Sequence, residues 1–178
     1  YSKVNLNTLS DADLFLSTEL LNYSNQDQEV SLEGKIEEIT FSHKITLKAN
    51  EKKLVKLSSK ELPQLHIANA KLWWPNGYGE PNLYHMQLSA KANNEISCSE
   101  EIDFGIREVG DYINENGHRG YTINGKKILI KGAGWVDDLL LGNTVEFDEA
   151  QVKYVKDMNL NCIRFEAFWG KDHSIYNL

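Results

Sequence analysis

The most constraining feature of this sequence is an alternation of apolar and polar residues that runs from Asp13 to about Phe104. Apolar side chains recur at every second position in a series of short segments. Side chains of a β-strand point alternately to opposite faces of a sheet, so this period predicts half-buried strands. The alternating positions are Leu14, Leu16 and Leu20; Val30, Leu32 and Ile36; Ile45 and Leu47; Leu65 and Ile67; Tyr84, Met86, Leu88 and Ala90; Ile96 and Cys98; Ile102 and Phe104.

Turn-forming residues separate these segments. Polar or glycine-containing stretches interrupt the pattern at Asn25–Asp27, Ala49–Glu51, Asn76–Gly77 and Ala92–Asn94, and such stretches favour turns. Seven or eight short strands at a spacing of about 8–12 residues are typical of an antiparallel sandwich. The Cys…Trp…Cys spacing of antibody domains is absent from the sequence. We therefore predict an immunoglobulin-like β-sandwich over residues 1–109 from its strand pattern alone.

The pattern changes after Val109. Asn124 and Gly125 separate two apolar segments and suit a two-residue hairpin turn that needs positive φ at both positions. Gly132–Trp135 is rich in small residues and is predicted to be a loop after a strand at 126–131. The stretch 110–120 is the best candidate for a linker.

A helix and a strand follow this loop. Residues 147–161 place apolar side chains at helical spacing, and two acidic residues near the start suit the helix dipole. The inward stripe is either Ala150 with Tyr154, or Val152 with Val155 and Met158. A strand, loop, helix and strand in this order predict a parallel βαβ unit. We thus expect a mainly β chain in which residues 110–178 hold a hairpin and the first βαβ unit of a truncated (β/α) barrel.

Composition narrows the range of partners. The chain has 19 Lys and Arg against 26 Asp and Glu, a net charge of −7. This balance argues against nucleic acid and anionic membranes, which need a basic patch. The five histidines share no ligand spacing, and Cys98 and Cys162 have no CxxC partner, so we expect no metal or cofactor. We expect both cysteines to be free, buried thiols.

Three strings in order carry a family resemblance: LWWPNGYGEPNLY at 72–84, FGIREV at 104–109, and YTINGKKILIKGAGWVDDLLL continuing to NLNCIRFEAFWG. Together they resemble glycoside hydrolase family 2. The first two resemble the end of that family's immunoglobulin-like domain, and the third resembles the start of its catalytic barrel. GAGWVDDLLL and IRFEAFWGKDHSIYNL are most similar to the exo-β-D-glucosaminidase branch, with β-mannosidase-type enzymes as near relatives.

The resemblance implies an O-glycosyl hydrolase that cleaves terminal β-glucosaminides or β-mannosides with retention, using two carboxylates that flank the anomeric carbon. In the family both glutamates stand on later barrel strands, so we expect them beyond Leu178 and expect the chain alone to be an inactive scaffold. The resemblance favours a periplasmic or secreted location. The alternative is a non-catalytic carbohydrate-binding or interaction sandwich, although Tyr23, Phe41 and Tyr84 are too scattered for an aromatic face.

The resemblance also implies substrate-binding residues. Arg164 matches an arginine that orients the nucleophilic carboxylate through charge-assisted hydrogen bonds, in a forked geometry that lysine does not reproduce. Asp138 and Glu166 match two carboxylates that would hold the ammonium of an amino sugar, which needs anionic partners once desolvated. Asp137 precedes Asp138, so either aspartate could be the pocket carboxylate. The alternative for each residue is an ordinary ion-paired or capping role.

The tryptophans fall into two groups. Trp135 and Trp169 each follow a barrel strand and are candidate sugar contacts, with packing between loops as the alternative. Trp73 and Trp74 precede a proline and are expected to form a structural corner. The strands around 126–131 and 162–168 would leave apolar surface and unpaired edges, so we expect that region to be mobile or covered by a second copy of the chain.

Overall fold

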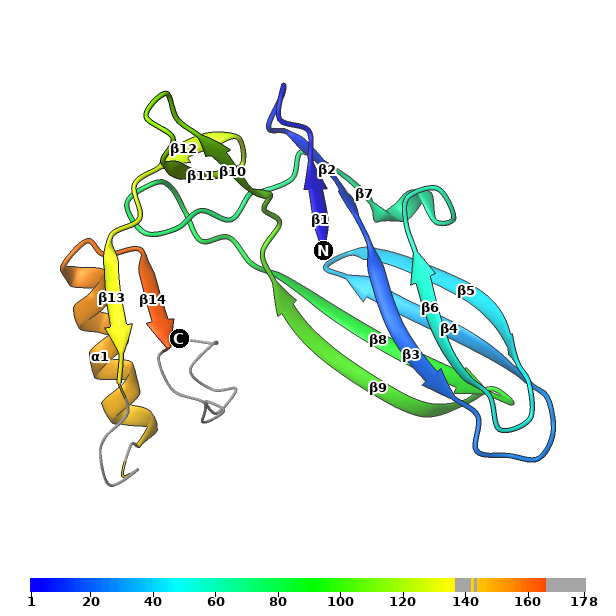
Figure 1. The fold of residues 1–178 in the computed structure, drawn as a ribbon. Coiled ribbons are helices and arrows are strands. Elements are labelled where there is room, and N and C mark those ends of the chain that lie inside the picture. The colour runs from blue at the N-terminus through cyan, green and yellow to red at the C-terminus, as the bar shows by residue number, and fades with distance from the viewer. Residues whose placement is uncertain (137–141, 143, 166–178) are drawn as a thin grey trace. The chain divides into compact units, whose positions relative to one another are not determined.

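A computed structural model describes residues 1–136, 142 and 144–165 of the chain. These residues group into two compact units (Figure 1). The first unit comprises Tyr1–Trp73 and Asn82–Val109, and the second comprises Trp74–Pro81 together with the described residues from Gly110 onward. The segment Trp74–Pro81 therefore interrupts the first unit in sequence but belongs to the second.

The first unit is an antiparallel β-sandwich. One layer is a four-stranded sheet in the order β5-β4-β8-β9, formed by β4 (Gln28–Ile36), β5 (Ile39–Leu47), β8 (Tyr84–Ala92) and β9 (Glu95–Phe104). The other layer holds the sheets β1-β2-β7 and β3-β6, formed by β1 (Ser2–Val4), β2 (Asp11–Leu14), β3 (Leu16–Leu21), β6 (Lys52–Leu57) and β7 (His66–Ala68), with the 3-10 turn η1 (Pro63–Leu65) before β7.

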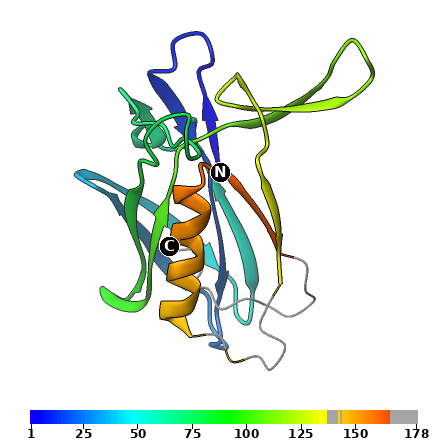
Figure 2. The same ribbon diagram turned by 90° about the vertical axis from the view of Figure 1, so that its left-hand side faces the viewer.

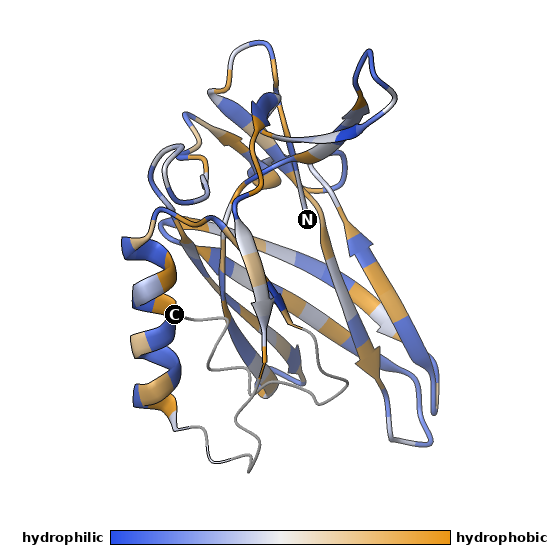
Figure 3. Ribbon diagram, turned by 60° about the vertical axis from the view of Figure 1, so that its left-hand side comes forward, coloured by the Kyte–Doolittle hydropathy of each residue, from blue (hydrophilic) through white to orange (hydrophobic). Residues whose placement is uncertain are grey.

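The predicted alternation is confirmed along most of the sandwich. Hydrophobic and hydrophilic residues alternate as orange and blue bands along the strands (Figure 3). The buried residues on these strands include Leu20, Val30, Leu32, Ile36, Val55, Leu57, Met86, Leu88 and Ala90. Gly34 stands in the same buried row, opposite Phe41 on the neighbouring strand. A Cβ atom at Gly34 would lie 2.0 Å from Cζ of Phe41, so the missing side chain makes room for the ring.

Strand β9 departs from the prediction. Ile96 and Ile102 are 62% and 46% exposed, and the Cys98 thiol is exposed as well. β9 lies at the edge of its sheet and pairs with β8 on one side, and edge strands receive less cover than central ones. The expectation of a buried Cys98 is therefore wrong. Cys162 is half-buried, and both cysteines are free thiols.

The second unit begins with a three-stranded antiparallel sheet in the order β10-β11-β12, formed by β10 (Val109–Ile113), β11 (Arg119–Ile123) and β12 (Lys126–Ile128). Asn124 and Gly125 have φ values of 49° and 75°, which confirms the predicted two-residue turn between β11 and β12. The stretch predicted to be a linker instead forms parts of β10 and β11 with the turn between them.

A parallel strand pair and a helix follow this sheet. β13 (Gly132–Trp135) pairs in parallel with β14 (Cys162–Phe165), and α1 (Val145–Asp157) connects them. Figure 2 shows α1 running alongside the two strands. The helix and the second strand of the predicted βαβ unit are confirmed, but its first strand is Gly132–Trp135, which was predicted to be a loop. The predicted strand at 126–131 instead contains the antiparallel β12. Closure into a barrel stays a prediction.

Strand β13 contains a glycine at a position where it closely approaches the backbone of β14. A Cβ atom at Gly132 would lie 1.9 Å from the carbonyl oxygen of Cys162, so the two backbones approach closely only because Gly132 has no side chain. The sequence pattern suggested a loop because glycine is poor in β-propensity. In this fold the close contact between Gly132 and the Cys162 carbonyl requires glycine at this strand position.

Helix α1 starts at a conventional cap. The Thr144 hydroxyl accepts a hydrogen bond from Phe147 N at 3.3 Å, which satisfies one of the donors that a helix start leaves free. Val152 and Val155 are half-buried, whereas Tyr154 and Met158 are 67% and 61% exposed. Of the two predicted stripes, the one with Val152 and Val155 therefore faces inward, but Met158 does not belong to it. Among the described residues, no helix is both long and apolar enough to cross a membrane.

Substitution of Gly132 by alanine should loosen the parallel pair. The added methyl group would overlap the Cys162 carbonyl, and overpacking of this kind costs about 1–3 kcal/mol. Hydrogen exchange followed by NMR should show faster exchange of the β14 amides, with β4 and β8 unchanged. Gly117→Asn is the control for a glycine substitution without overlap, because a Cβ atom at Gly117 meets nothing within 4 Å. Asparagine is used there because Gly117 has a φ of +77°, which asparagine adopts more readily than alanine. Unchanged β14 exchange in Gly132→Ala would contradict this account.

The contact between His85 on β8 and Asp103 on β9 should make the stability of the fold depend on pH. Its Nδ1 lies 2.7 Å from Oδ1 of Asp103, and this hydrogen bond, with the charges of Asp103, Glu101 and Glu37, raises the pKa of His85 above 6.5. Since the folded pKa exceeds the unfolded one, the protonated ring stabilises the fold below the unfolded pKa. That contribution is lost as pH rises through the folded pKa.

An NMR titration of the His85 ring should therefore give a pKa above 6.5 that falls in Asp103→Asn. The stability difference between the two proteins should be larger at pH 5 than at pH 9, because the ring is charged only at the lower pH. An identical His85 titration curve in both proteins would show that Asp103 does not set this pKa.

Candidate functional site

The parallel pairing brings the ends of β13 and β14 to one edge. Trp135, the last residue of β13, pairs with Phe165, the last residue of β14, and Gly134 pairs with Arg164. The carboxyl ends of such strands form the active-site face of (β/α) barrels. Of the candidate substrate-binding residues, the structure thus places Trp135 and Arg164 on neighbouring strands, one register step apart.

The Trp135 ring packs at this edge. The side chain is buried, with 6% exposed. Its ring centroid lies 6.1 Å from that of Phe165, and the two ring planes are tilted by 60°. Such a tilted pair is a favourable aromatic arrangement. This burial agrees with the packing alternative, and the sugar-contact role of Trp135 stays a prediction.

Arg164 has the opposite character. Its side chain is exposed, while Ile163 and Phe165 on either side of it are half-buried. Directly across the pair stands Gly134, which has no side chain to crowd the guanidinium group. The Arg164 side chain therefore lies on the exposed face near the end of β14. Its role in orienting a carboxylate stays a prediction.

The remaining candidates, Asp137, Asp138, Glu166 and Trp169, lie outside the described residues. In sequence, the two aspartates follow Trp135 closely and Glu166 comes directly after Phe165. Their proposed contacts with an amino sugar stay predictions.

Asn161 holds the opposite ends of these strands together. Its Nδ2 donates to the Leu129 carbonyl at 2.9 Å, and its Oδ1 accepts from Lys131 N at 2.9 Å. One side chain thus bonds the backbone just before β13 from a position just before β14. The sequence reasoning missed Asn161, and an asparagine directly before a predicted strand was the available signal.

The paired tryptophans are engaged in local packing. The Arg107 guanidinium lies 4.5 Å from the centroid of the Trp73 ring, and a Cβ atom at Gly105 would lie 2.7 Å from Trp73 Cβ. Trp74 has a similar neighbour, since a Cβ atom at Gly79 would lie 2.8 Å from its ring. Both side chains are half-buried, which agrees with the structural corner rather than an open sugar platform.

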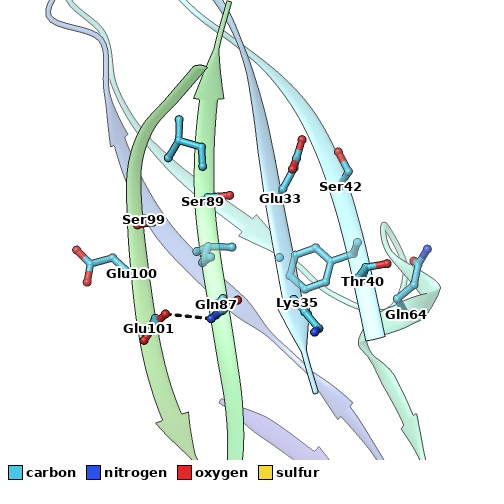
Figure 4. A pocket seen from close by; sticks show the side chains of 14 residues that line it. Glu33, Lys35, Thr40, Ser42, Gln64, Gln87, Ser89, Ser99, Glu100 and Glu101 are labelled. Atoms are coloured by element: carbon cyan, nitrogen blue, oxygen red, sulfur yellow. Dashed lines mark hydrogen bonds between the residues drawn. The ribbon is translucent and has the colours of Figure 1, made fainter. Parts of the chain in front are cut away.

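A polar hollow of about 740 Å³ lies on the four-stranded sheet (Figure 4). It is lined mainly by polar and charged side chains, and Gln87 Nε2 donates to Glu101 Oε1 at 3.0 Å within it. Phe41 is the one aromatic residue of its lining, and Phe41 is only 5% exposed. The hollow therefore lacks the aromatic surface on which a sugar ring would stack. The carbohydrate-binding alternative for the sandwich stays a prediction.

The described part of the chain shows no group of three or more His, Cys, Asp or Glu side chains that could hold a metal ion.

Known proteins are similar to this chain in sequence and in fold. The family model for glycosyl hydrolases family 2 matches residues 1–107. An exo-beta-D-glucosaminidase of Streptomyces avermitilis is 33% identical over 166 residues, which cover 93% of this chain and 18% of that protein. A mannosylglycoprotein endo-beta-mannosidase of Lilium longiflorum is 34% identical over 112 residues, which cover 61% of this chain and 11% of that protein.

Solved structures agree with the sequence matches. The crystal structure of an exo-chitosanase from Amycolatopsis orientalis superimposes with a TM-score of 0.88 and 28% identity, covering 99% of this chain and 20% of that one. The chain thus spans about a fifth or less of the length of these relatives. The sandwich, the βαβ unit and the matched sequence together show that the chain belongs to glycosyl hydrolase family 2.

Proposed function

We propose that this chain is the immunoglobulin-like domain and the start of the catalytic barrel of a longer glycosidase, which removes terminal β-linked glucosamine or mannose with retention. The observation that carries the proposal is the similarity to an exo-beta-D-glucosaminidase over 93% of the chain. The parallel ends of β13 and β14 support it, because they present an exposed arginine where a barrel would have its substrate.

The proposal divides the work between the two parts of the chain. Residues 1–109 brace the barrel, and residues 110–178 supply its first strands and part of the pocket rim. The acid/base and the nucleophile are two glutamates beyond Leu178. A retaining mechanism needs both on opposite sides of the anomeric carbon, so the chain alone acts as scaffold.

The proposed rim residues have distinct roles. Arg164 donates two parallel hydrogen bonds to the nucleophilic glutamate and holds it ionised and oriented. Asp138 and Glu166 accept hydrogen bonds from the ammonium of glucosamine, whose desolvation would otherwise be unfavourable. A mannoside has no ammonium group, so these two carboxylates determine the preference between the two substrates.

The same proposal covers partners and location. The partner is a carbohydrate, and the protein acts in the periplasm or outside the cell. Apolar side chains of the second unit are exposed, among them Leu129 at 69%, Phe147 at 52% and Tyr154 at 67%. We propose that the remaining barrel covers them in the longer protein, and that the isolated chain self-associates through them.

The isolated chain should not hydrolyse glycosides. It is expected to release no chromophore from 4-nitrophenyl β-glucosaminide or β-mannoside, because it lacks the paired carboxylates of the mechanism. The longer protein, assayed in parallel, serves as the positive control. Turnover by pure isolated chain would show that an active centre lies within these residues.

Asp138→Asn in the longer protein should change substrate preference. Loss of a charged hydrogen-bond partner is expected to lower kcat/KM for the glucosaminide by about 10- to 100-fold, with little change for the mannoside. Asp137→Asn is the matched control for the adjacent position. If Asp137→Asn shows the selective loss instead, the pocket carboxylate is Asp137. Equal losses on both substrates would contradict an ammonium site at either position.

A further inference from the structure

The segment Trp74–Pro81 lies between β7 and β8 in sequence but belongs to the second unit. It is closed by its own backbone, since Trp74 N donates to Glu80 O and Tyr78 N donates to Pro75 O, each at 3.0 Å. Gly77 has a φ of +81°, a conformation that favours glycine. The segment is thus a compact turn with defined directions for its side chains.

Asn76 uses this turn to reach the end of α1. Its Nδ2 donates to the carbonyl oxygens of Lys156 and Leu160, both at 3.0 Å. The last carbonyls of a helix lack partners within the helix, and a side-chain amide has two N–H donors to offer. Asn76 therefore fixes the short connection by which the chain leaves α1 and enters β14.

Tyr78 acts in the same way on the other strand. Its hydroxyl oxygen accepts a hydrogen bond from Leu129 N at 2.8 Å, in the connection between β12 and β13. The Lys126 ammonium lies 5.5 Å from the centroid of its ring, within the range of a cation–π contact. Asn76 and Tyr78 thus hold the chain just before each of the two parallel strands.

We infer that Asn76 and Tyr78 are positioning residues for the strand ends that carry Arg164. Each strand has only four residues, so a shift at its start is transmitted to its end. This inference rests on the proposed function, in which Arg164 orients the nucleophilic glutamate. A misplacement of about 1 Å in such an orienting group costs about 100-fold in rate.

The chain offers matched pairs of variants. Asn76→Asp removes both donors without changing shape and adds a negative charge at a helix C-terminus, where it is unfavourable. Asn82→Asp is its control, because Asn82 Nδ2 makes one similar bond to Leu72 O at 2.9 Å within the first unit. Tyr78→Phe removes one hydroxyl acceptor. Tyr84→Phe is its control, because Tyr84 Oη accepts from Lys71 N at 2.8 Å, also within the first unit.

Two measurements test the inference. In the chain itself, hydrogen exchange of the β13 and β14 amides should accelerate in Asn76→Asp and Tyr78→Phe, and should not change in Asn82→Asp and Tyr84→Phe. In the longer protein, Asn76→Asp and Tyr78→Phe should lower kcat about 10- to 100-fold with KM changed less than threefold. The assay is run well below the melting temperature, with the folded fraction measured by near-ultraviolet circular dichroism, so that loss of folded protein is separated from misplacement.

The outcomes separate this inference from the function on which it rests. If the unmodified longer protein cleaves neither β-glycoside, the proposed function fails, and the exchange measurement alone decides whether the two residues position the strands. If the unmodified protein is active, the inference is overturned when either variant resembles its control in exchange or in kcat. A fall in kcat that only follows the folded fraction would also overturn it.

Discussion

A parallel strand pair has no hairpin turn of its own to set its register, and this constraint governs the pairing of β13 with β14. Parallel strands are joined by a long crossover, here through α1, so other contacts must fix where β14 lies against β13. Gly132 permits the two backbones to approach. Asn161 then bonds the backbone before β13 from its place before β14. The candidate site depends on this register because it pairs Gly134 with Arg164.

In the sandwich, strand register is fixed in a different way. Its strands are antiparallel, and a slip of one residue would turn every buried side chain outward. The rows containing Leu32 and Leu88 therefore specify their own pairing. Where cover is lacking, as on β9, the apolar residues Ile96 and Ile102 stay exposed. Register in the sandwich follows from hydrophobic burial, whereas register in the parallel β13–β14 pair follows from a few polar side chains.

This difference explains which parts of the molecule the sequence predicted. The sandwich strands, the Asn124–Gly125 turn and α1 were predicted because each has a local signal: a period of two, a turn dipeptide and a helical period. The strand at Gly132–Trp135 was mistaken for a loop because its glycines are required by a partner distant in sequence. Burial of Cys98 was mispredicted because no local pattern distinguishes an edge strand from a central one.

For the candidate site, the sequence alone determined the residue types and their order: an arginine and acidic residues directly after short apolar segments, within motifs similar to a glycosidase family. The tertiary structure alone decided that Trp135 and Arg164 lie on neighbouring strands one register step apart, that the indole is buried, and that Asn76 and Tyr78 contact the chain before the two strands. The physical reason is the separation along the chain of the residues that interact. Alternation and turn chemistry act over a few residues, whereas the bonds from Asn76 to Lys156 and Leu160 join segments that are far apart in the chain.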